Sequence, residues 1–183
     1  MILDRKPDRI VEVGSGYSTL IARSAIQYSE SRTKLIIIDP APRTSVSGAA
    51  DEIIPKFVED SGLENLVWGE NDLLFIDSSH VCRSRGDLPL LFCKILPRLP
   101  RGALVHFHGI FLPYEYPTNY DDRCYNEQYL LHCLLSGGTR YETLFSAHYL
   151  SRQQPEEMQG VFGQLVGADP EYNGASYWLG VTG

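Results

Sequence analysis

The stretch RIVEVGSGYSTLIA, from Arg9 to Ala22, decides the fold. The apolar run Arg9–Val13 leads directly into the glycine-rich turn Gly14–Gly16. After the turn, apolar residues recur on one face of a helical repeat, which predicts a helix with Ser18 as its N-cap. A strand, a glycine turn and a helix in this order let the backbone and the helix N–H groups approach a ligand closely.

Short apolar runs continue to alternate with longer amphipathic stretches, and this pattern is typical of repeated βαβ units. Strong strands are predicted over residues 34–39, 72–77 and 103–107, with a weaker edge strand over 51–58. Helices are predicted over 63–68, from Asp87 to a stop at Pro97, and over 126–135. Two closing strands, 141–150 and 176–181, are expected to pair antiparallel.

The composition limits the class of protein and its partners. With 43% hydrophobic and 21% charged residues, the 183-residue chain has the balance of a globular domain. The formal net charge of −7, with no run of Lys or Arg, argues against a nucleic-acid backbone as the main partner. No apolar run reaches the roughly 20 residues of a membrane span, and the N-terminus lacks a signal pattern, so we expect a cytoplasmic protein.

The cysteines show neither CxxC pairing nor the spacing of a metal finger; they are Cys82, Cys93, Cys124 and Cys133. Cys93 and Cys133 fall in apolar helical stretches, so we expect both to be small buried hydrophobes in a reduced protein.

We expect a single domain over residues 1–183. The first predicted strand starts at Arg9, which leaves no room for a preceding helix and fits a longer chain whose N-terminal helices are missing. A Pro- and Tyr-rich loop, residues 112–125, is a candidate lid, because loops of this length in compact domains are usually functional. Its aromatic rings either line an acceptor pocket or fold onto the core; they are Phe111, Tyr114, Tyr116, Tyr120 and Tyr125.

Two acidic residues accompany the glycine turn. Asp39 ends the next predicted strand, where a carboxylate can accept both hydroxyls of an adenosine ribose; a helix cap or an Asp-Pro turn with Pro40 is the alternative. Glu12 lies two residues before Gly14 and suits the ammonium of a methionyl group. The third glycine of a dinucleotide-binding GxGxxG is missing, so the pattern favours S-adenosylmethionine over a dinucleotide.

Longer segments carry a family resemblance: IVEVGSGYST, IIIDPAPR, NDLLFIDSSH, GDLPLLFCKILPRLPRGALVHFHGIFLP and NEQYLL. Together they resemble class I S-adenosylmethionine-dependent methyltransferases, in particular a bacterial subgroup with D-S-S-H after the fourth strand and H-x-H-D-I-F after the fifth. The resemblance spans residues 9–150. It implies an α/β, Rossmann-like, doubly wound fold: a mostly parallel seven-stranded sheet with an antiparallel last strand and helices on both faces.

The resemblance also implies the cofactor contacts. Glu12, Gly14, Gly16 and Ser18 would cradle the methionine part, Asp39 would hold the ribose, and residues 58–60 would lie near the adenine. The other predicted cofactor contacts are Ser15, Tyr17, Pro40, Asp77 and Ser78.

A divalent metal is a further implication. In the related catechol-type O-methyltransferases, the positions of Asp77, His108 and Gly109 bind a metal that positions the acceptor hydroxyl. Members of the subgroup usually carry aspartate where this chain has Gly109. Asp77 and His108 alone suit Mg²⁺ poorly, because Mg²⁺ prefers oxygen ligands in octahedral geometry. A softer metal bound by Asp77, His80 and His108 is the alternative.

Histidines supply the candidate general bases. His80 and His108 follow neighbouring predicted strands, whose carboxyl ends lie on the same edge of the sheet. They are the first candidates for removing a proton from an acceptor hydroxyl. His106 is the third, because it should face the same side as His108. Each of the three could instead be a hydrogen-bonded structural residue, which is the interpretation favoured for His132 in a helix and His148 in a late strand.

The leading hypothesis is therefore an S-adenosylmethionine-dependent methyltransferase that acts on a hydroxyl of a small molecule such as a sugar, a phenol or a natural product. It predicts neither a nucleic-acid nor a membrane partner and is compatible with a homodimer. Two alternatives stay open: a nicotinamide-dependent oxidoreductase, and a non-catalytic domain with the same fold.

Overall fold

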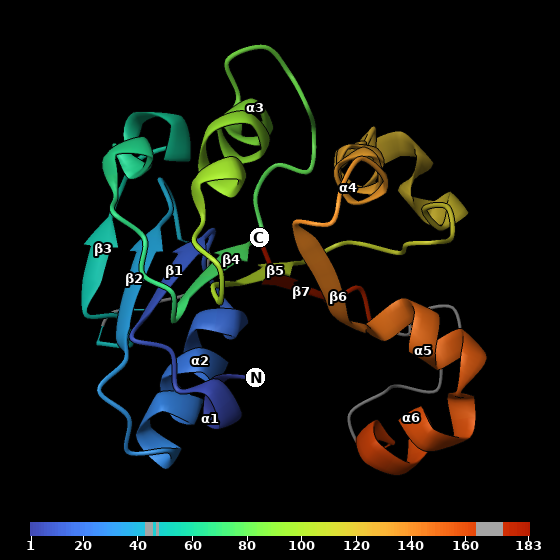
Figure 1. The fold of residues 1–183 in the computed structure, drawn as a ribbon, viewed down its shortest axis with the longest axis horizontal. Helices are drawn as coiled ribbons and strands as arrows, with labels where there is room; N and C mark the ends of the chain where they lie inside the picture. The colour runs from blue at the N-terminus through green and yellow to red at the C-terminus, as the bar shows by residue number, and fades with distance from the viewer. Residues whose placement is uncertain (43–45, 47, 164–173) are drawn as a thin grey trace.

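The computed structural model describes residues 1–42, 46, 48–163 and 174–183, and Figure 1 shows one sheet with helices packed on both of its faces. The strands are β1 (Arg9–Val13), β2 (Lys34–Ile38), β3 (Glu52–Ile54), β4 (Asp72–Ile76), β5 (Leu104–Phe107), β6 (Tyr141–Ser146) and β7 (Tyr177–Val181). Their order across the sheet is β3-β2-β1-β4-β5-β7-β6. Strands β1 to β5 pair in parallel, and β7 runs antiparallel to both of its neighbours. The predicted sheet is confirmed.

The helices are α1 (Ile2–Arg5), α2 (Tyr17–Tyr28), α3 (Asp87–Leu90), α4 (Glu127–Ser136), α5 (Ala147–Gln153) and α6 (Pro155–Phe162). A π-helical turn, Leu91–Ile95, and a 3₁₀ turn, Leu96–Arg98, extend α3. Further 3₁₀ turns are Val58–Asp60, Leu63–Asn65 and Thr118–Arg123.

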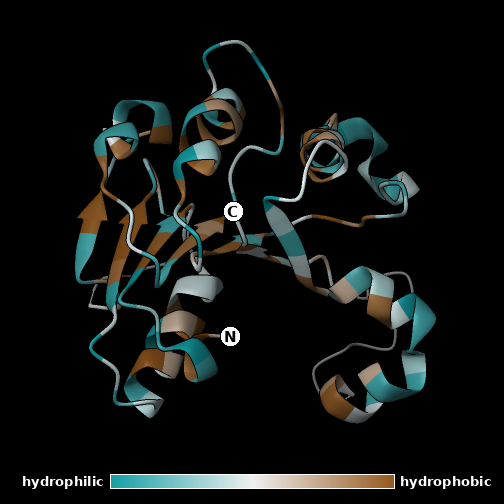
Figure 2. Cartoon of the chain, in the orientation of Figure 1, coloured by the Kyte–Doolittle hydropathy of each residue, from teal (hydrophilic) through white to brown (hydrophobic). Residues whose placement is uncertain are grey.

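Burial on both faces explains the nearly unbroken apolar sequence of the central strands. The register places Val11 of β1 between Ile36 of β2 and Leu74 of β4, and Figure 2 shows hydrophobic residues along these strands. One core contains Leu74 together with Leu91 and Leu131, from the α3 and α4 side of the sheet. A second core lies on the α2 side.

The second core contains Ile10, Ile26 and Leu35.

The strand order reverses direction between β1 and β4, which are neighbours in the sheet although β2 and β3 lie between them in the chain. Open α/β sheets bind ligands at such a switch point, at the carboxyl ends of the strands.

Several boundary predictions were wrong. The strand predicted over 141–150 ends at Ser146, and residues 147–153 form α5, so His148 lies in a helix. Pairing with β7 stops at the Ser146–Tyr177 pair, which leaves the following residues without a strand partner. The predicted strand over 51–58 shrinks to β3, and the predicted helix over 63–68 shrinks to a 3₁₀ turn.

Other corrections concern caps and burial. Gly16 rather than Ser18 is the N-cap of α2, and the short helix α1 does precede β1. Cys93 and Cys133 are exposed, as are the other two cysteines. Cys93 lies between Leu91 and Ile95, which take the buried side of the turn. Within the described ranges, no helix combines the length and the hydropathy that crossing a bilayer requires.

Candidate functional site

A cavity of about 650 Å³ opens at the carboxyl ends of β1, β2, β4 and β5. This volume lies in the range of small-molecule sites. Five of its wall segments come from the turn after β1, the chain after β2, the region around Val58, the loop after β4 and the loop after β5. The residues from these segments include Gly14, Ser15, Asp39, Pro40, Phe57, Val58, Glu59, Asp77, Ser78, Ser79, His80, His108 and Gly109.

Gly14 allows the turn after β1 to lie directly against the loop after β4. Its φ of +89° lies in the region that favours glycine, and a Cβ built there would come within 2.2 Å of the Asp77 carbonyl oxygen. The Gly14 N–H donates to the Ile38 carbonyl at 3.0 Å. The turn therefore requires glycine for reasons of backbone geometry, before any ligand is considered.

Glu12 is buried beneath the turn. Its carboxylate accepts hydrogen bonds from Ser18 Oγ at 2.5 Å and from Thr19 Oγ1 at 2.7 Å. Burial raises the pKa of Glu12 to about 6, although both hydroxyl hydrogen bonds act in the opposite direction. Among the predicted cofactor contacts, Glu12, Gly16, Tyr17 and Ser18 do not line the cavity. Glu12 and Ser18 instead tie β1 to the first turn of α2.

Asp39 lies on the cavity wall and is held in two ways. Ser15 Oγ donates to Asp39 Oδ2 at 2.5 Å, and the Ala41 N–H donates to Oδ1 at 2.8 Å. The second contact is the local turn that the sequence offered as an alternative. The first joins the glycine turn to the end of β2, so the two segments predicted to bind one ligand are in direct contact.

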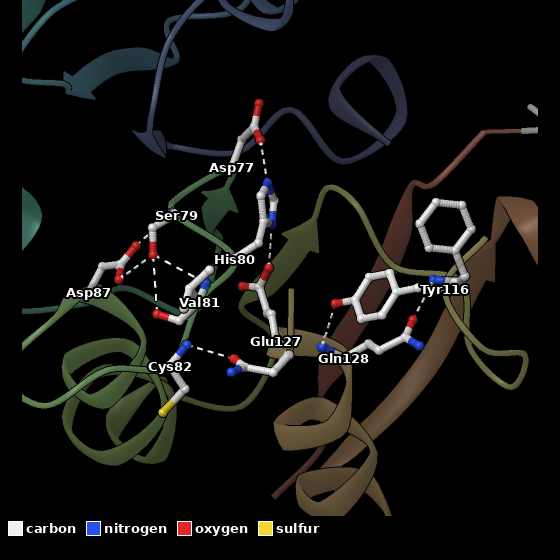
Figure 3. Close-up of polar contacts among 11 residues, drawn as sticks. Asp77, Ser79, His80, Val81, Cys82, Asp87, Tyr116, Glu127 and Gln128 are labelled. Atoms are coloured by element: carbon white, nitrogen blue, oxygen red, sulfur yellow. Dashed lines mark hydrogen bonds and ion pairs between the residues drawn. The ribbon is translucent and has the colours of Figure 1, made fainter. Parts of the chain in front are cut away.

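The D-S-S-H segment after β4 is clamped by the start of α3. Asp87 accepts from the Ser79 N–H at 2.7 Å and from Ser79 Oγ at 2.8 Å (Figure 3). Asp77 begins the loop, and its N–H donates to the Val13 carbonyl at 2.9 Å. The loop is thus fixed against both β1 and α3.

His80 lies between two carboxylates, as Figure 3 shows. Its Nδ1 is 2.7 Å from Glu127 Oε2, and its Nε2 is 3.3 Å from Asp77 Oδ1. Burial alone would lower the pKa of His80, but the hydrogen bonds and charges of Asp77 and Glu127 outweigh it and raise that pKa to about 10. His80 is therefore an imidazolium at neutral pH, which does not suit the predicted role of a general base.

Glu127 is a functional residue that the sequence reasoning missed. It is fully buried at the start of α4, and its role there is to pair with His80. An acidic residue in the first turn of a helix is ordinarily explained by the helix dipole. Nothing in the sequence connects it to a histidine 47 positions away.

His106 is buried away from the cavity, which makes the prediction of it as a third candidate base wrong. Its ring stacks on Phe75 at 4.1 Å and packs against Trp178 at 4.7 Å, and its Nε2 is 2.7 Å from Ser176 Oγ. Burial lowers the pKa of His106 to about 3. His108, in contrast, is exposed and lies on the cavity wall.

The residues present do not fit a metal centre. Within the part of the chain that the structure describes, no group of three or more His, Cys, Asp or Glu side chains is arranged to hold a metal ion. Both ring nitrogens of His80 face carboxylates, so His80 cannot serve as the neutral ligand that a softer metal would need. Gly109 has a φ of +76°, and a Cβ there would meet the His80 ring at 3.1 Å. Asp77 and His108 are left as an incomplete pair.

The loop over residues 112–125 places two of its tyrosines, Tyr120 and Tyr125, on the cavity wall. Phe111 and Tyr116 lie behind them, with the Phe111 ring 5.3 Å from Tyr120 and the Tyr116 ring 6.1 Å from Tyr125. Gln128 of α4 fixes this layer: its N–H donates to the Tyr116 hydroxyl and its Oε1 accepts from the Phe111 N–H, both at 3.1 Å. Two of the rings therefore line the cavity, and two pack behind them.

Comparison with known proteins gives a family match and several structural neighbours. The family described as "Methyltransferase domain" (Methyltransf_24) matches residues 11–110, which is more than half of the chain. No curated protein sequence matches. The S-adenosylhomocysteine-bound methyltransferase PaMTH1 of Podospora anserina is similar in structure, with a TM-score of 0.58, 18% identity and coverage of 100% of this chain and 75% of PaMTH1.

Two further neighbours have comparable folds. Cofactor-bound Rv0187 from MTB has a TM-score of 0.53 and 13% identity, over 97% of this chain and 73% of its own. The D160 form of CmcI with Mg and SAM has a TM-score of 0.51 and 15% identity, over 78% of this chain and 60% of CmcI. At these identities the likeness concerns the fold, and the family match carries the assignment. The chain belongs to the methyltransferase domain family.

Proposed function

We propose that this protein transfers the methyl group of S-adenosylmethionine to a hydroxyl of a small molecule. The observation that carries the proposal is one continuous cavity, which joins the glycine turn and Asp39 at one end to His108 at the other. The family match supports the reaction class, and two neighbours of this fold were solved with S-adenosylhomocysteine or S-adenosylmethionine. The nicotinamide-dependent alternative is set aside because of the family match.

The cofactor half fits the chemistry of a sulfonium nucleoside. Gly14 exposes bare backbone, and Asp39 presents a carboxylate to the cavity beside Ser15. We assign the ribose hydroxyls to Asp39 and the methionyl part to the turn at Gly14–Ser15. Glu12, which the sequence placed in direct contact with the ammonium, supports the turn from beneath and adds negative potential there.

When bound, S-adenosylmethionine supplies a methyl group on a positively charged sulfur. The protein must orient an acceptor hydroxyl in line with that group and receive the hydroxyl proton. His108 is the exposed imidazole on the wall, and we assign the proton to it. His80 holds the loop at Asp77 in place and takes no part in proton transfer, because it is already protonated.

The test separates cofactor binding from turnover. Calorimetry with S-adenosylhomocysteine should show binding to the wild type and at least about tenfold weaker binding to Asp39→Asn, because a charged ribose acceptor is lost. Asp8→Asn is the matched control, since Asp8 is exposed, lies before β1 and is outside the cavity wall. Absence of heat for the wild type at millimolar ligand would contradict the proposal.

Turnover is measured with methyl-labelled cofactor and a panel of phenols and sugars. His108→Gln should lower kcat by about 10²–10⁴-fold while cofactor affinity is kept, and the exposed His132→Gln should change neither. Binding without labelled product from any acceptor would favour the non-catalytic alternative. The homodimer and the small-molecule acceptor remain predictions of the same proposal.

A further inference from the structure

Charge is distributed unevenly around the cavity. Four carboxylates lie on its wall: Asp39, Glu59, Asp77 and Asp87. Asp39 is bonded to Ser15, Asp87 to Ser79, and Asp77 to His80, so three of the four are engaged by neighbouring side chains.

Two arginines, Arg83 and Arg123, line the same cavity. Arg83 belongs to the loop after β4. A Cβ at the buried Gly86 would lie 2.8 Å from Arg83 Cγ and 3.3 Å from Arg83 Nε, so the missing side chain at Gly86 is what leaves room for this arginine. The Gly86 N–H also donates to the Arg83 carbonyl at 3.1 Å. The backbone of Arg83 is thus held in the loop by Gly86.

Arg123 comes from a different segment, at the end of the Thr118–Arg123 turn. Its guanidinium carbon lies 4.1 Å from the centre of the Tyr120 ring and 5.8 Å from that of Tyr125. A guanidinium stacked on an aromatic face keeps its N–H edge free for a planar anion. The aromatic contact therefore orders Arg123 without using its hydrogen-bond donors.

Both side chains line the cavity that also contains His108. Tyr125 packs on the His80 ring at 4.6 Å, and the His80 ring lies against Gly109, next to His108. Across the described segments, no ion pair includes Arg83 or Arg123, although the chain carries a formal net charge of −7. Two cationic groups without carboxylate partners on the wall of one cavity attract an anion locally, against the charge of the whole molecule.

We propose that the methyl acceptor carries an anionic group, a carboxylate or a phosphate, which Arg83 and Arg123 bind while its hydroxyl faces His108. This inference rests on the proposed function and names the substrate class of the same site. Arginine is suited to either anion because its fork of N–H donors makes paired hydrogen bonds to two oxygens.

The experiment uses the full chain saturated with S-adenosylhomocysteine and compares matched probes by calorimetry. Phenol, para-hydroxybenzoate and para-hydroxyphenyl phosphate form one set, and glucose and glucuronate form another. In at least one set the anionic member should bind about tenfold or more tightly than its neutral counterpart. Whichever of the carboxylate and phosphate probes binds more tightly identifies the anionic group that the site prefers. Because both arginines are exposed, the preference should shrink as ionic strength rises from about 0.05 M to about 0.5 M.

Arg83→Gln and Arg123→Gln should each remove most of the preference for the anion and leave the affinity for S-adenosylhomocysteine unchanged. The matched controls are Arg85→Gln, in the same loop but outside the cavity wall, and Arg152→Gln. Arg152 stacks on Tyr114 at 4.5 Å, as Arg123 does on Tyr120, but does not line the cavity. Both control variants should keep the preference.

Three results would overturn the inference. Equal affinity for neutral and anionic probes, or failure of every anion to bind, would show that the arginines do not select an anion. A preference that survives in both Arg83→Gln and Arg123→Gln would place the anion elsewhere. Loss of S-adenosylhomocysteine binding in these variants would assign the arginines to the cofactor. Failure of the wild type to bind S-adenosylhomocysteine would instead remove the proposed function itself.

Discussion

Two glycines of the turn after β1 meet different surroundings. At Gly14, φ is +89° and the space that a Cβ would need is taken by the Asp77 carbonyl. At Gly16, φ is 163°, which is extended backbone, and a Cβ would meet nothing within 4 Å. The same residue type is therefore obligatory at one position and replaceable at the other.

Substitution by alanine tests this difference. Gly14→Ala should lower the free energy of unfolding by about 1–3 kcal/mol or more, because a strained backbone and a clash are added together. Gly16→Ala is the matched control and should cost less than about 1 kcal/mol. Urea denaturation of the two variants measures both values, and equal losses would contradict the geometry.

The sequence ranked His80 and His108 ahead of His106 as candidate bases, and the surroundings of the three side chains give a different order. His106 is buried between Phe75 and Trp178, His80 is bound by two carboxylates, and His108 is exposed on the cavity wall. Strand alternation placed His106 and His108 on one side, but β5 ends at Phe107, so the alternation does not extend to His108. Trp178 comes from β7, whose position no local pattern reveals.

At the scale of elements, the loop after β4 and helix α4 are joined at one residue. The His80 carbonyl accepts from the Asn126 N–H at 3.0 Å and from the Glu127 N–H at 3.3 Å, while its ring pairs with the Glu127 carboxylate. His80 has a φ of +59°, so this contact holds a backbone conformation that is uncommon outside glycine. The connection positions the loop after β4 and the start of α4 relative to each other.

Glu127→Gln removes the charge from this connection and should lower the free energy of unfolding at neutral pH by about 3–5 kcal/mol, because a buried cation loses a partner. Glu64→Gln is the control: Glu64 pairs with Lys94 on the surface, and its loss should have little effect. Chemical denaturation measures both variants. A Glu127→Gln protein as stable as the wild type would contradict the ion pair.

The same connection predicts a dependence on pH. The folded-state pKa of His80, about 10, lies above its ordinary value of 6.5, so the stabilisation is fully present below about pH 6.5 and is lost as pH rises through about 10. The wild type should therefore lose stability across this window, and Glu127→Gln should lose less of it because less of that stabilisation is left. If the free energy of unfolding of the two proteins changed with pH at the same slope, His80 would not be the titrating group.

Element types were predictable where a segment is buried on both faces. β1, β2, β4 and β5 are nearly continuous apolar runs, and the structure moves their predicted ends by at most one residue. The end of β6 was not predictable, because residues 147–150 continue a suitable pattern while the partner strand has ended. The burial of Cys93 was misjudged for a similar reason: an apolar neighbourhood in sequence does not say which side of a turn is covered.

For the whole molecule, the residues of the site fall on both sides of the end of the family match. The family match ends at residue 110, just after β5, and contains the glycine turn, Asp39 and the D-S-S-H loop. Tyr120, Tyr125 and Arg123 of the cavity wall all follow that point, as does Glu127, the partner of His80. Their arrangement depends on long-range packing of residues 112–125 on α4, which a one-dimensional pattern does not specify.

Cofactor binding should be visible as stability of the whole molecule, because the cradle exists only when β1, β2 and β4 are assembled. At S-adenosylhomocysteine concentrations of about 100 times Kd, the free energy of unfolding should rise by about 2.7 kcal/mol. For a domain of this size, that corresponds to an increase in Tm of roughly 5–10 °C in a thermal melt. An unchanged Tm at a concentration that saturates the calorimetric signal would mean that the ligand does not depend on the folded sheet.

The contact between Gly14 and the Asp77 carbonyl sets a rule for redesign. A different loop grafted after β4 must return the main chain at residue 77 to the same position, because the turn at Gly14 packs directly against the Asp77 carbonyl. Under the proposed function, re-targeting the protein to a new acceptor is therefore best confined to residues 112–125 and the exposed side chain of Arg123. There, sequence can be exchanged without dismantling the donor cradle.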